Sequence, residues 1–168
     1  MGASLEWTFA YGSNMDVDDL RSWFIANGHH KARIERCEPA TLPGFRLVWN
    51  YYSQSRKGGA ANIERFAGAV LPGVALHVNG AGLAAIDRKE GHPNYYSRGD
   101  VPVRAQLIGG TSVEAWVYVA VADRCRATEI PPTRAYLDMM IRAAERVGLP
   151  AAHVEMLRST PTMESSDG

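Results

Sequence analysis

The sequence predicts an α+β fold in which several strands gather centrally and helices pack around them. Runs of β-branched and aromatic residues recur at 45–52, 74–78 and 113–121, and each is typical of a strand. Apolar residues at helical spacing occur in separate segments near the start, the middle and the end of the chain. No linker or internal repeat divides the 168 residues, which fit one domain with a core.

Composition narrows the classes of ligand. Lys and Arg total 18, as do Asp and Glu, so the formal net charge is zero. The chain has no dense basic patch typical of a nucleic-acid-binding protein, and we expect a small-molecule ligand instead. No apolar run approaches the roughly 20 residues that a membrane span needs, so we expect no membrane partner.

The cysteines indicate a reducing environment. Cys37 and Cys125 lie far apart and form neither a Cys-x-x-Cys motif nor a set with zinc spacing. The N-terminus lacks the basic and apolar regions of a secretory signal. We therefore expect a cytoplasmic protein without a metal site.

The first segments predict a strand, a polar turn and a helix. Residues 5–10 are mostly apolar and predict a strand, and the helix is expected over about 18–27, with Gly28 as its stop. The turn between them, 11–15, contains a glycine and polar side chains. Because N–H groups at a helix start lack intrahelical partners, such a turn can bind an anion. Taken alone, however, such a turn is more often a plain connection in which Asn14 or Asp16 caps the helix, because Asn and Asp caps are common.

The next part of the chain predicts strands. Residues 42–44 predict a turn, 45–52 a strand, 53–59 a polar loop and 60–63 a short extended piece. Two further apolar runs, split by Pro72 and Gly73, end in a strand at 74–78. Trp49, Tyr51 and Tyr52 are typical of core residues, although they would also suit the wall of a pocket.

A short helix is expected to end at Gly91, so that Glu90 lies in its last turn. Glu90 is the candidate for proton transfer. A solvated glutamate at a helix end is the alternative, because exposed glutamates are common. Asp87 and Glu90 would also suit a site with two carboxylates.

The remaining residues predict two long strands and two helices. A strand over 95–108 is interrupted by Gly99, Asp100 and Pro102. A hairpin turn falls at Gly109–Gly110, and 113–121 is typical of a central strand. After a loop at 123–132, Thr133 can cap a helix over 134–147 that stops at Gly148. A final short helix ends near 158, and 159–168 is polar, so we expect one domain over 1–158 followed by a flexible tail.

Several motifs together resemble the gamma-glutamylcyclotransferase family. Residues 9–15, Phe-Ala-Tyr-Gly-Ser-Asn-Met, closely resemble its substrate loop, with Met15 where several members have leucine. Ile-Asp-x-x-Glu-Gly at 86–91, followed by Tyr95 and Tyr96, resembles a second motif. Further similarities are Gly-Gly at 58–59, Gly-Val at 73–74, Pro-Pro-x-x-x-Tyr at 131–136 and Gly-Leu-Pro at 148–150. They occur in the family's order over nearly the whole chain.

The resemblance implies a small mixed β-barrel with flanking helices. It also implies that Glu90 is the general acid/base and that the substrate-binding residues are Tyr11, Gly12, Ser13, Asn14, Met15, Tyr95 and Tyr136. Whether Tyr95 or Tyr96 faces the pocket stays open. No cofactor or metal is implied, and the oligomeric state is not indicated.

The implied activity is that of a lyase that converts a γ-glutamyl amide into 5-oxoproline and a free amine. The substrate's α-amine would attack its own γ-carbonyl, so the protein needs no Ser or Cys nucleophile. One carboxylate with a raised pKa could move the protons. An amidohydrolase and a non-catalytic binding module are the alternatives, and the leaving amine is not indicated.

Overall fold

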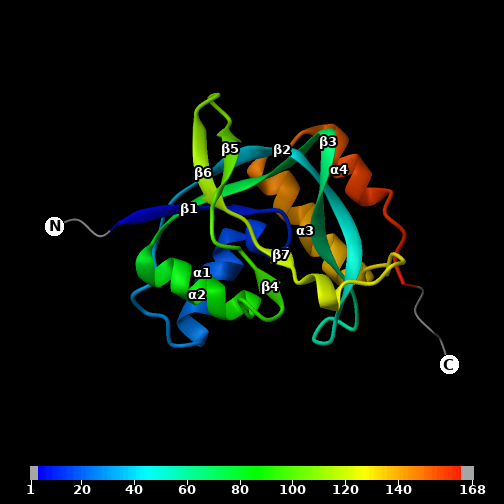
Figure 1. Ribbon diagram of the computed structural model, residues 1–168, viewed down its shortest axis with the longest axis horizontal. Helices are drawn as coiled ribbons and strands as arrows, with labels where there is room; N and C mark the ends of the chain where they lie inside the picture. Colours follow the sequence, from blue (N-terminus) through cyan, green and yellow to red (C-terminus); the bar gives the residue numbers. More distant parts are fainter. Residues whose placement is uncertain (1–3, 164–168) are drawn as a thin grey trace.

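The computed structural model describes residues 4–163, and within them five strands close a barrel in the order β1–β3–β2–β5–β6 (Figure 1). The strands are β1 (Leu5–Ala10), β2 (Ile34–Ser53), β3 (Gly58–Asn79), β5 (Val103–Leu107) and β6 (Ser112–Trp116). β1 and β6 are parallel and the other neighbours are antiparallel, so the barrel is mixed. The predicted α+β barrel is confirmed.

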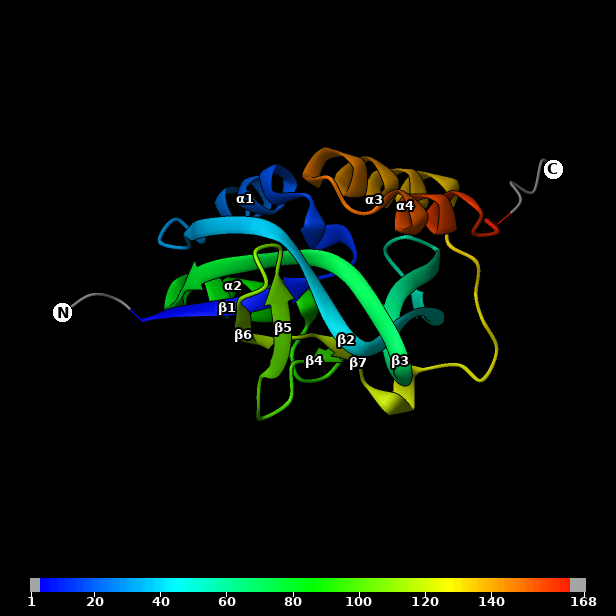
Figure 2. The same cartoon turned by 90° about the horizontal axis from the view of Figure 1, so that it is seen from above.

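Helices pack against the outside of the strands. They are α1 (Val17–Ala26), α2 (Gly80–Glu90), α3 (Arg134–Val147) and α4 (Ala151–Arg158), with 3-10 turns at η1 (Ser13–Met15) and η2 (Ala122–Arg124). Figure 2 shows α1, α3 and α4 along one side of the strands. The predicted helices are confirmed. The predicted cap of α3 is also confirmed, because the side chain of Thr133 accepts the N–H of Tyr136.

Two long strands replace the separate pieces predicted between residues 34 and 79. β2 and β3 form one hairpin, and the turn expected at 42–44 lies inside β2 as an irregularity between Pro43 and Phe45. The split at Pro72 and Gly73 is likewise absent, because β3 pairs with β2 through both residues. Pairing with neighbouring strands carries each strand through residues that would end it locally.

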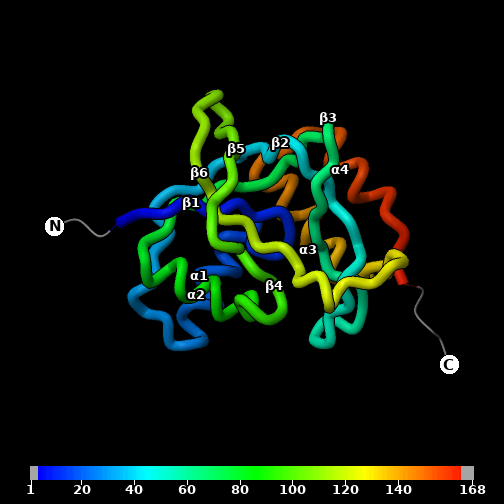
Figure 3. The backbone as a smooth tube through the Cα atoms, viewed as in Figure 1, coloured from blue at the N-terminus to red at the C-terminus, as the bar shows by residue number. Residues whose placement is uncertain are grey.

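Of two long strands predicted near the end of the sheet, one has the expected interruption and the other is wrong in extent. The strand over 95–108 is divided, at the predicted interruption, into β4 (Tyr96–Ser97) and β5, and Gly99 adopts a left-handed conformation between them. The strand expected over 113–121 is divided into β6 and β7 (Val119–Ala120), and β7 leaves the barrel to pair with β4. Figure 3 shows the β5–β6 hairpin standing away from the rest of the backbone.

The core lies between the barrel and the helices. α3 buries the apolar face expected from its sequence, formed by Leu137, Met140, Ile141 and Ala144. In the predicted tail, Met163 donates its N–H to the carbonyl of Pro132, so residues 159–163 lie near the start of α3. The rest of that tail, 164–168, is outside the described residues.

Candidate active site

A cavity of about 380 Å³ lies where the end of β1, the end of α2 and the β2–β3 turn come together. It is within the size range of small-molecule sites. Seven of the eight residues expected to form the site line it: Tyr11, Gly12, Ser13, Asn14, Glu90, Tyr95 and Tyr136. Met15 does not line it, because its side chain is fully buried in the core beneath the loop.

The loop after β1 forms one wall of the cavity. Asp16, rather than Asn14, caps α1 by accepting the N–H of Asp19, which leaves the Asn14 side chain for the cavity. Among residues 4–163, no protein acceptor takes the N–H groups of Gly12, Ser13 and Asn14. A Cβ atom on Gly12 would lie 3.2 Å from the Tyr136 hydroxyl, so glycine lets the loop approach α3 closely.

Glu90 is the last residue of α2, and its carboxylate points into the cavity. Gly91 follows with a φ of +67° and ends the helix directly behind it. Oε1 of Glu90 accepts a hydrogen bond of 2.7 Å from Nδ2 of Asn14. Nζ of Lys89 donates to Oδ1 of the same amide at 2.6 Å and to Oγ of Ser13 at 3.4 Å.

Burial has the largest effect on the pKa of the Glu90 carboxyl. It raises the pKa of the Glu90 carboxyl above its ordinary value, while the Lys89 ammonium, the hydrogen bond from Asn14 and the Arg56 guanidinium act in the opposite direction. Burial also lowers the pKa of Lys89, against the attraction of Glu90. A carboxyl whose pKa is raised can take up and return a proton more readily near neutral pH.

Buried tyrosine hydroxyls surround the carboxylate. Tyr11 donates to the carbonyl of Tyr118 at 2.5 Å, and Tyr96 donates to the carbonyl of Ala61 at 2.8 Å. Tyr136 accepts the N–H of Ala61 at 3.3 Å. Burial raises the pKa of Tyr11, Tyr96 and Tyr136, so these hydroxyls stay neutral and available for hydrogen bonding.

The structure distinguishes the two adjacent tyrosines. Both line the cavity, but Tyr95 is 47% exposed and lies beneath the guanidinium of Arg124. Tyr96 is the deeper of the two, and its ring contacts that of Tyr51 with centroids 4.9 Å apart. Tyr95 is therefore a residue of the rim, and Tyr96 forms part of the inner wall.

Several lining residues were not expected from the sequence. Arg56, in the β2–β3 turn, places its guanidinium 4.3 Å from the centroid of the Tyr136 ring. Lys89 is a second such residue. Tyr96 and Tyr51, which the sequence left open as pocket residues, also line the cavity, whereas Trp49 packs edge-on against Tyr136 in the core. A single arginine in a polar loop carries no sequence signal, because such residues are usually solvated.

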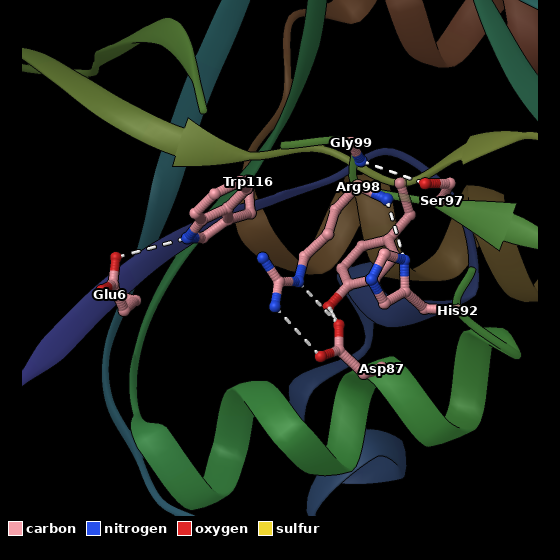
Figure 4. A network of polar contacts seen from close by, with 8 residues as sticks. Glu6, Asp87, His92, Ser97, Arg98, Gly99 and Trp116 are labelled. Atoms are coloured by element: carbon pink, nitrogen blue, oxygen red, sulfur yellow. Dashed lines mark hydrogen bonds and ion pairs between the residues drawn. The ribbon is translucent and has the colours of Figure 1, made fainter. Parts of the chain in front are cut away.

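Asp87 is not part of a site with two carboxylates. In Figure 4 its side chain points from α2 toward Arg98, whose guanidinium donates to both carboxylate oxygens at 2.8 and 3.2 Å. The hydroxyl of Tyr118 also donates to Asp87, at 2.6 Å. Asp87 therefore anchors β4 and the segment before β7 to α2, whereas Glu90 faces the cavity.

No group of three or more His, Cys, Asp or Glu side chains within residues 4–163 is placed to hold a metal ion. In the same range, no helix has both the length and the apolar character that a membrane crossing requires.

Comparison with known proteins agrees with this architecture. The family described as "Gamma-glutamyl cyclotransferase, AIG2-like" matches residues 8–137. A solved gamma-glutamyl cyclotransferase is 22% identical, with a TM-score of 0.80, and the alignment covers 98% of this chain and 93% of that one. An uncharacterized protein from Homo sapiens is 23% identical (TM-score 0.79; 98% and 92% covered). No curated protein sequence matches the chain.

A third structure extends the same fold to a bacterial protein. YkqA from Bacillus subtilis is 22% identical to this chain, with a TM-score of 0.76. The alignment covers 95% of this chain and 56% of YkqA. At these identities the structural similarities establish the fold.

Proposed function

Since this chain belongs to the AIG2-like gamma-glutamyl cyclotransferase family, we propose that it converts a γ-glutamyl amide into 5-oxoproline and a free amine, with Glu90 as the general acid/base. One observation carries the proposal. A buried carboxylate with a raised pKa faces a cavity of substrate size, and an amide from the family's loop binds it. This is the group that the reaction needs.

In the proposed reaction the nitrogen of the substrate's α-amine attacks the γ-carbonyl carbon. A C–N bond forms within the substrate to give a tetrahedral intermediate, and the C–N bond to the leaving amine then breaks. Glu90 takes a proton from the attacking nitrogen and gives it to the leaving nitrogen, so the carboxylate is regenerated. Intramolecular attack through a five-membered ring provides a high effective concentration of the nucleophile.

The loop after β1 is suited to the anionic parts of the substrate. The N–H groups of Gly12, Ser13 and Asn14 can donate to the α-carboxylate or to the oxygen that gains charge in the tetrahedral intermediate. Buried neutral hydroxyls from Tyr11 and Tyr136 lie on the same side. They supply polar contacts without adding negative charge beside Glu90.

The β2–β3 turn is suited to the leaving amine. Arg56 lines the cavity together with Ser53 and Ser55. If the loop after β1 binds the α-carboxylate of the γ-glutamyl group, the Arg56 guanidinium is left to bind a second anionic group. A leaving amine that carries its own carboxylate would complement this wall. Amino acids and peptides belong to that class, whereas polyamines do not.

A product analysis tests the proposal. γ-Glutamyl amides are incubated with the protein in ¹⁸O-labelled water, and the masses of the products are measured by mass spectrometry. Cyclisation yields unlabelled 5-oxoproline, and blocking the substrate's α-amine by acylation abolishes the reaction. Labelled glutamate, or equal turnover of the blocked substrate, would instead establish an amidohydrolase. Binding without turnover would establish a binding module.

A further inference from the structure

We propose that Lys89 is a positioning residue of this site, which fixes the orientation of the Asn14 amide and thereby leaves Oε2 of Glu90 as the oxygen that exchanges a proton with the substrate. The inference rests on the proposed function for the identity of the substrate. The contacts that carry it belong to the protein alone.

The first step concerns the two ends of the Asn14 side chain. An amide has an acceptor end, Oδ1, and a donor end, Nδ2, and either end could face a carboxyl group. The Lys89 ammonium can only donate, and it lies 2.6 Å from Oδ1. It therefore holds the acceptor end, and Nδ2 is left facing Glu90, 2.7 Å from Oε1.

The second step concerns the two oxygens of Glu90. Oε1 is occupied by the Asn14 amide, and among residues 4–163 no protein donor binds Oε2. A proton transferred to Oε1 would displace a charge-assisted hydrogen bond. Protonation of Oε2 displaces no such hydrogen bond, so Oε2 is the oxygen available to the substrate's amine.

The third step concerns the protonation state of the carboxyl. Without Lys89, the Asn14 amide could turn over and accept a hydrogen bond from the protonated Glu90 through Oδ1. The protonated acid would then be as well bound as the carboxylate. With Lys89 in place this alternative is closed, so the amide favours the ionised form, which is the form a general base needs.

Burial and sequence position make this role specific. Lys89 lines the cavity on the same helical turn as Glu90, and its second hydrogen bond, to Oγ of Ser13, ties it to the same loop. The other cation acting on the Glu90 carboxyl is Arg56, from the β2–β3 turn. Tyrosines from the other walls also act on it: Tyr11, Tyr51, Tyr96, Tyr118 and Tyr136. Arg88 and Tyr95 line the same cavity, and the Asp19 carboxylate acts on the Lys89 ammonium.

The test is a titration of Glu90 that needs no substrate. Protein labelled with ¹³C at the glutamate side-chain carboxyl is followed by NMR as a function of pH, and the Glu90 signal is identified by its loss in Glu90→Gln. We expect Lys89→Met, which keeps the length of the side chain, to raise the pKa of Glu90 by about one unit or more. Lys89→Arg, which keeps the donor and the charge, should restore most of the difference.

A double-mutant comparison separates positioning from charge alone. Removing Lys89 in an Asn14→Ala background should shift the pKa of Glu90 less than in the wild type, because the amide that Lys89 orients is gone. Arg56→Met removes a cation that makes no hydrogen bond to Asn14, and its effect should be the same in both backgrounds. Equal effects of Lys89→Met in both backgrounds would overturn the proposal.

Kinetics provide the second readout. Between the Glu90 pKa of the wild type and the higher pKa of Lys89→Met, only the variant has a protonated Glu90, so its kcat should be about tenfold lower. The kcat of the variant should recover as the pH rises above this range. A higher KM with an unchanged pH profile would instead make Lys89 a ligand of the substrate's carboxylate. If wild-type protein formed no 5-oxoproline from any γ-glutamyl amide, the proposed function would fail while the titration could still succeed.

Discussion

Nδ2 of Asn14 lies 2.7 Å from Oε1 of Glu90, although 76 positions separate the two residues in the sequence. The contact joins the loop after β1 to the last residue of α2. The cavity is therefore assembled by the closure of the barrel, which places the end of one strand beside the end of a distant helix.

Replacing Glu90 by glutamine should remove proton transfer and keep the cavity. Glutamine has nearly the same volume but no titratable proton at neutral pH, so kcat should fall by about 100-fold or more. Binding of a γ-glutamyl ligand, measured by calorimetry, should persist. Near-wild-type turnover of Glu90→Gln would require a different base.

Asp87→Asn is the matched control on the same helix. It should change kcat far less than Glu90→Gln, because Asp87 binds Arg98 and Tyr118 rather than facing the cavity. Its cost should appear as stability, at about 1–2 kcal/mol of unfolding free energy, because a charged partner is removed from partly buried donors. Denaturant unfolding measures this, and an inactive but fully stable Asp87→Asn would contradict the assignment.

The pH dependence of kcat should report the Glu90 carboxyl. Burial raises its pKa above the ordinary 4.5, and the base must be deprotonated to accept a proton. Activity should therefore be retained above the raised pKa and lost as the pH falls through it. The substrate's own amine titrates at higher pH and is recognised by its dependence on the substrate. If kcat fell only at or below pH 4.5, the ordinary pKa of a glutamate, desolvation would not be the dominant effect on the Glu90 carboxyl.

Tyr136→Phe should lower activity without unfolding the protein. The hydroxyl faces the cavity beside Gly12 and accepts the N–H of Ala61, while the ring packs against Trp49. Phenylalanine keeps the packing and leaves one buried N–H without its acceptor, at a cost of about 1–3 kcal/mol. Steady-state kinetics and thermal unfolding measure the two effects, and unchanged kinetics would assign Tyr136 to packing alone.

Arg56→Met should change the choice of substrate. The kcat/KM for γ-glutamyl amides whose leaving amine carries a carboxylate should fall by about tenfold or more, the value of one charge-assisted contact. Amides of uncharged amines should be affected much less. Lys57→Met, in the same turn but outside the cavity lining, is the control. Equal losses for both classes of substrate would place Arg56 outside the leaving-amine site.

Local sequence patterns correctly predicted most of the helices and strands, but they gave the wrong extent for several strands. α3 follows from Thr133, its apolar face and Gly148, which are all local signals. The length of β2 and β3, and the departure of β7 from the barrel, depend instead on which strands lie beside them. Hydrogen bonds to a neighbouring strand cannot be inferred from the residues of one strand alone.

The sequence by itself determined the α+β class, the polar loop after β1 and the place of Glu90 at the end of a helix, because each depends on neighbouring residues. Only the tertiary structure decided that Met15 lies in the core, that Tyr96 is deeper than Tyr95, and that Asp87 turns to Arg98. It also decided that Lys89 meets Asn14. The direction of a side chain depends on the segments packed around it, and here those segments are distant in the chain.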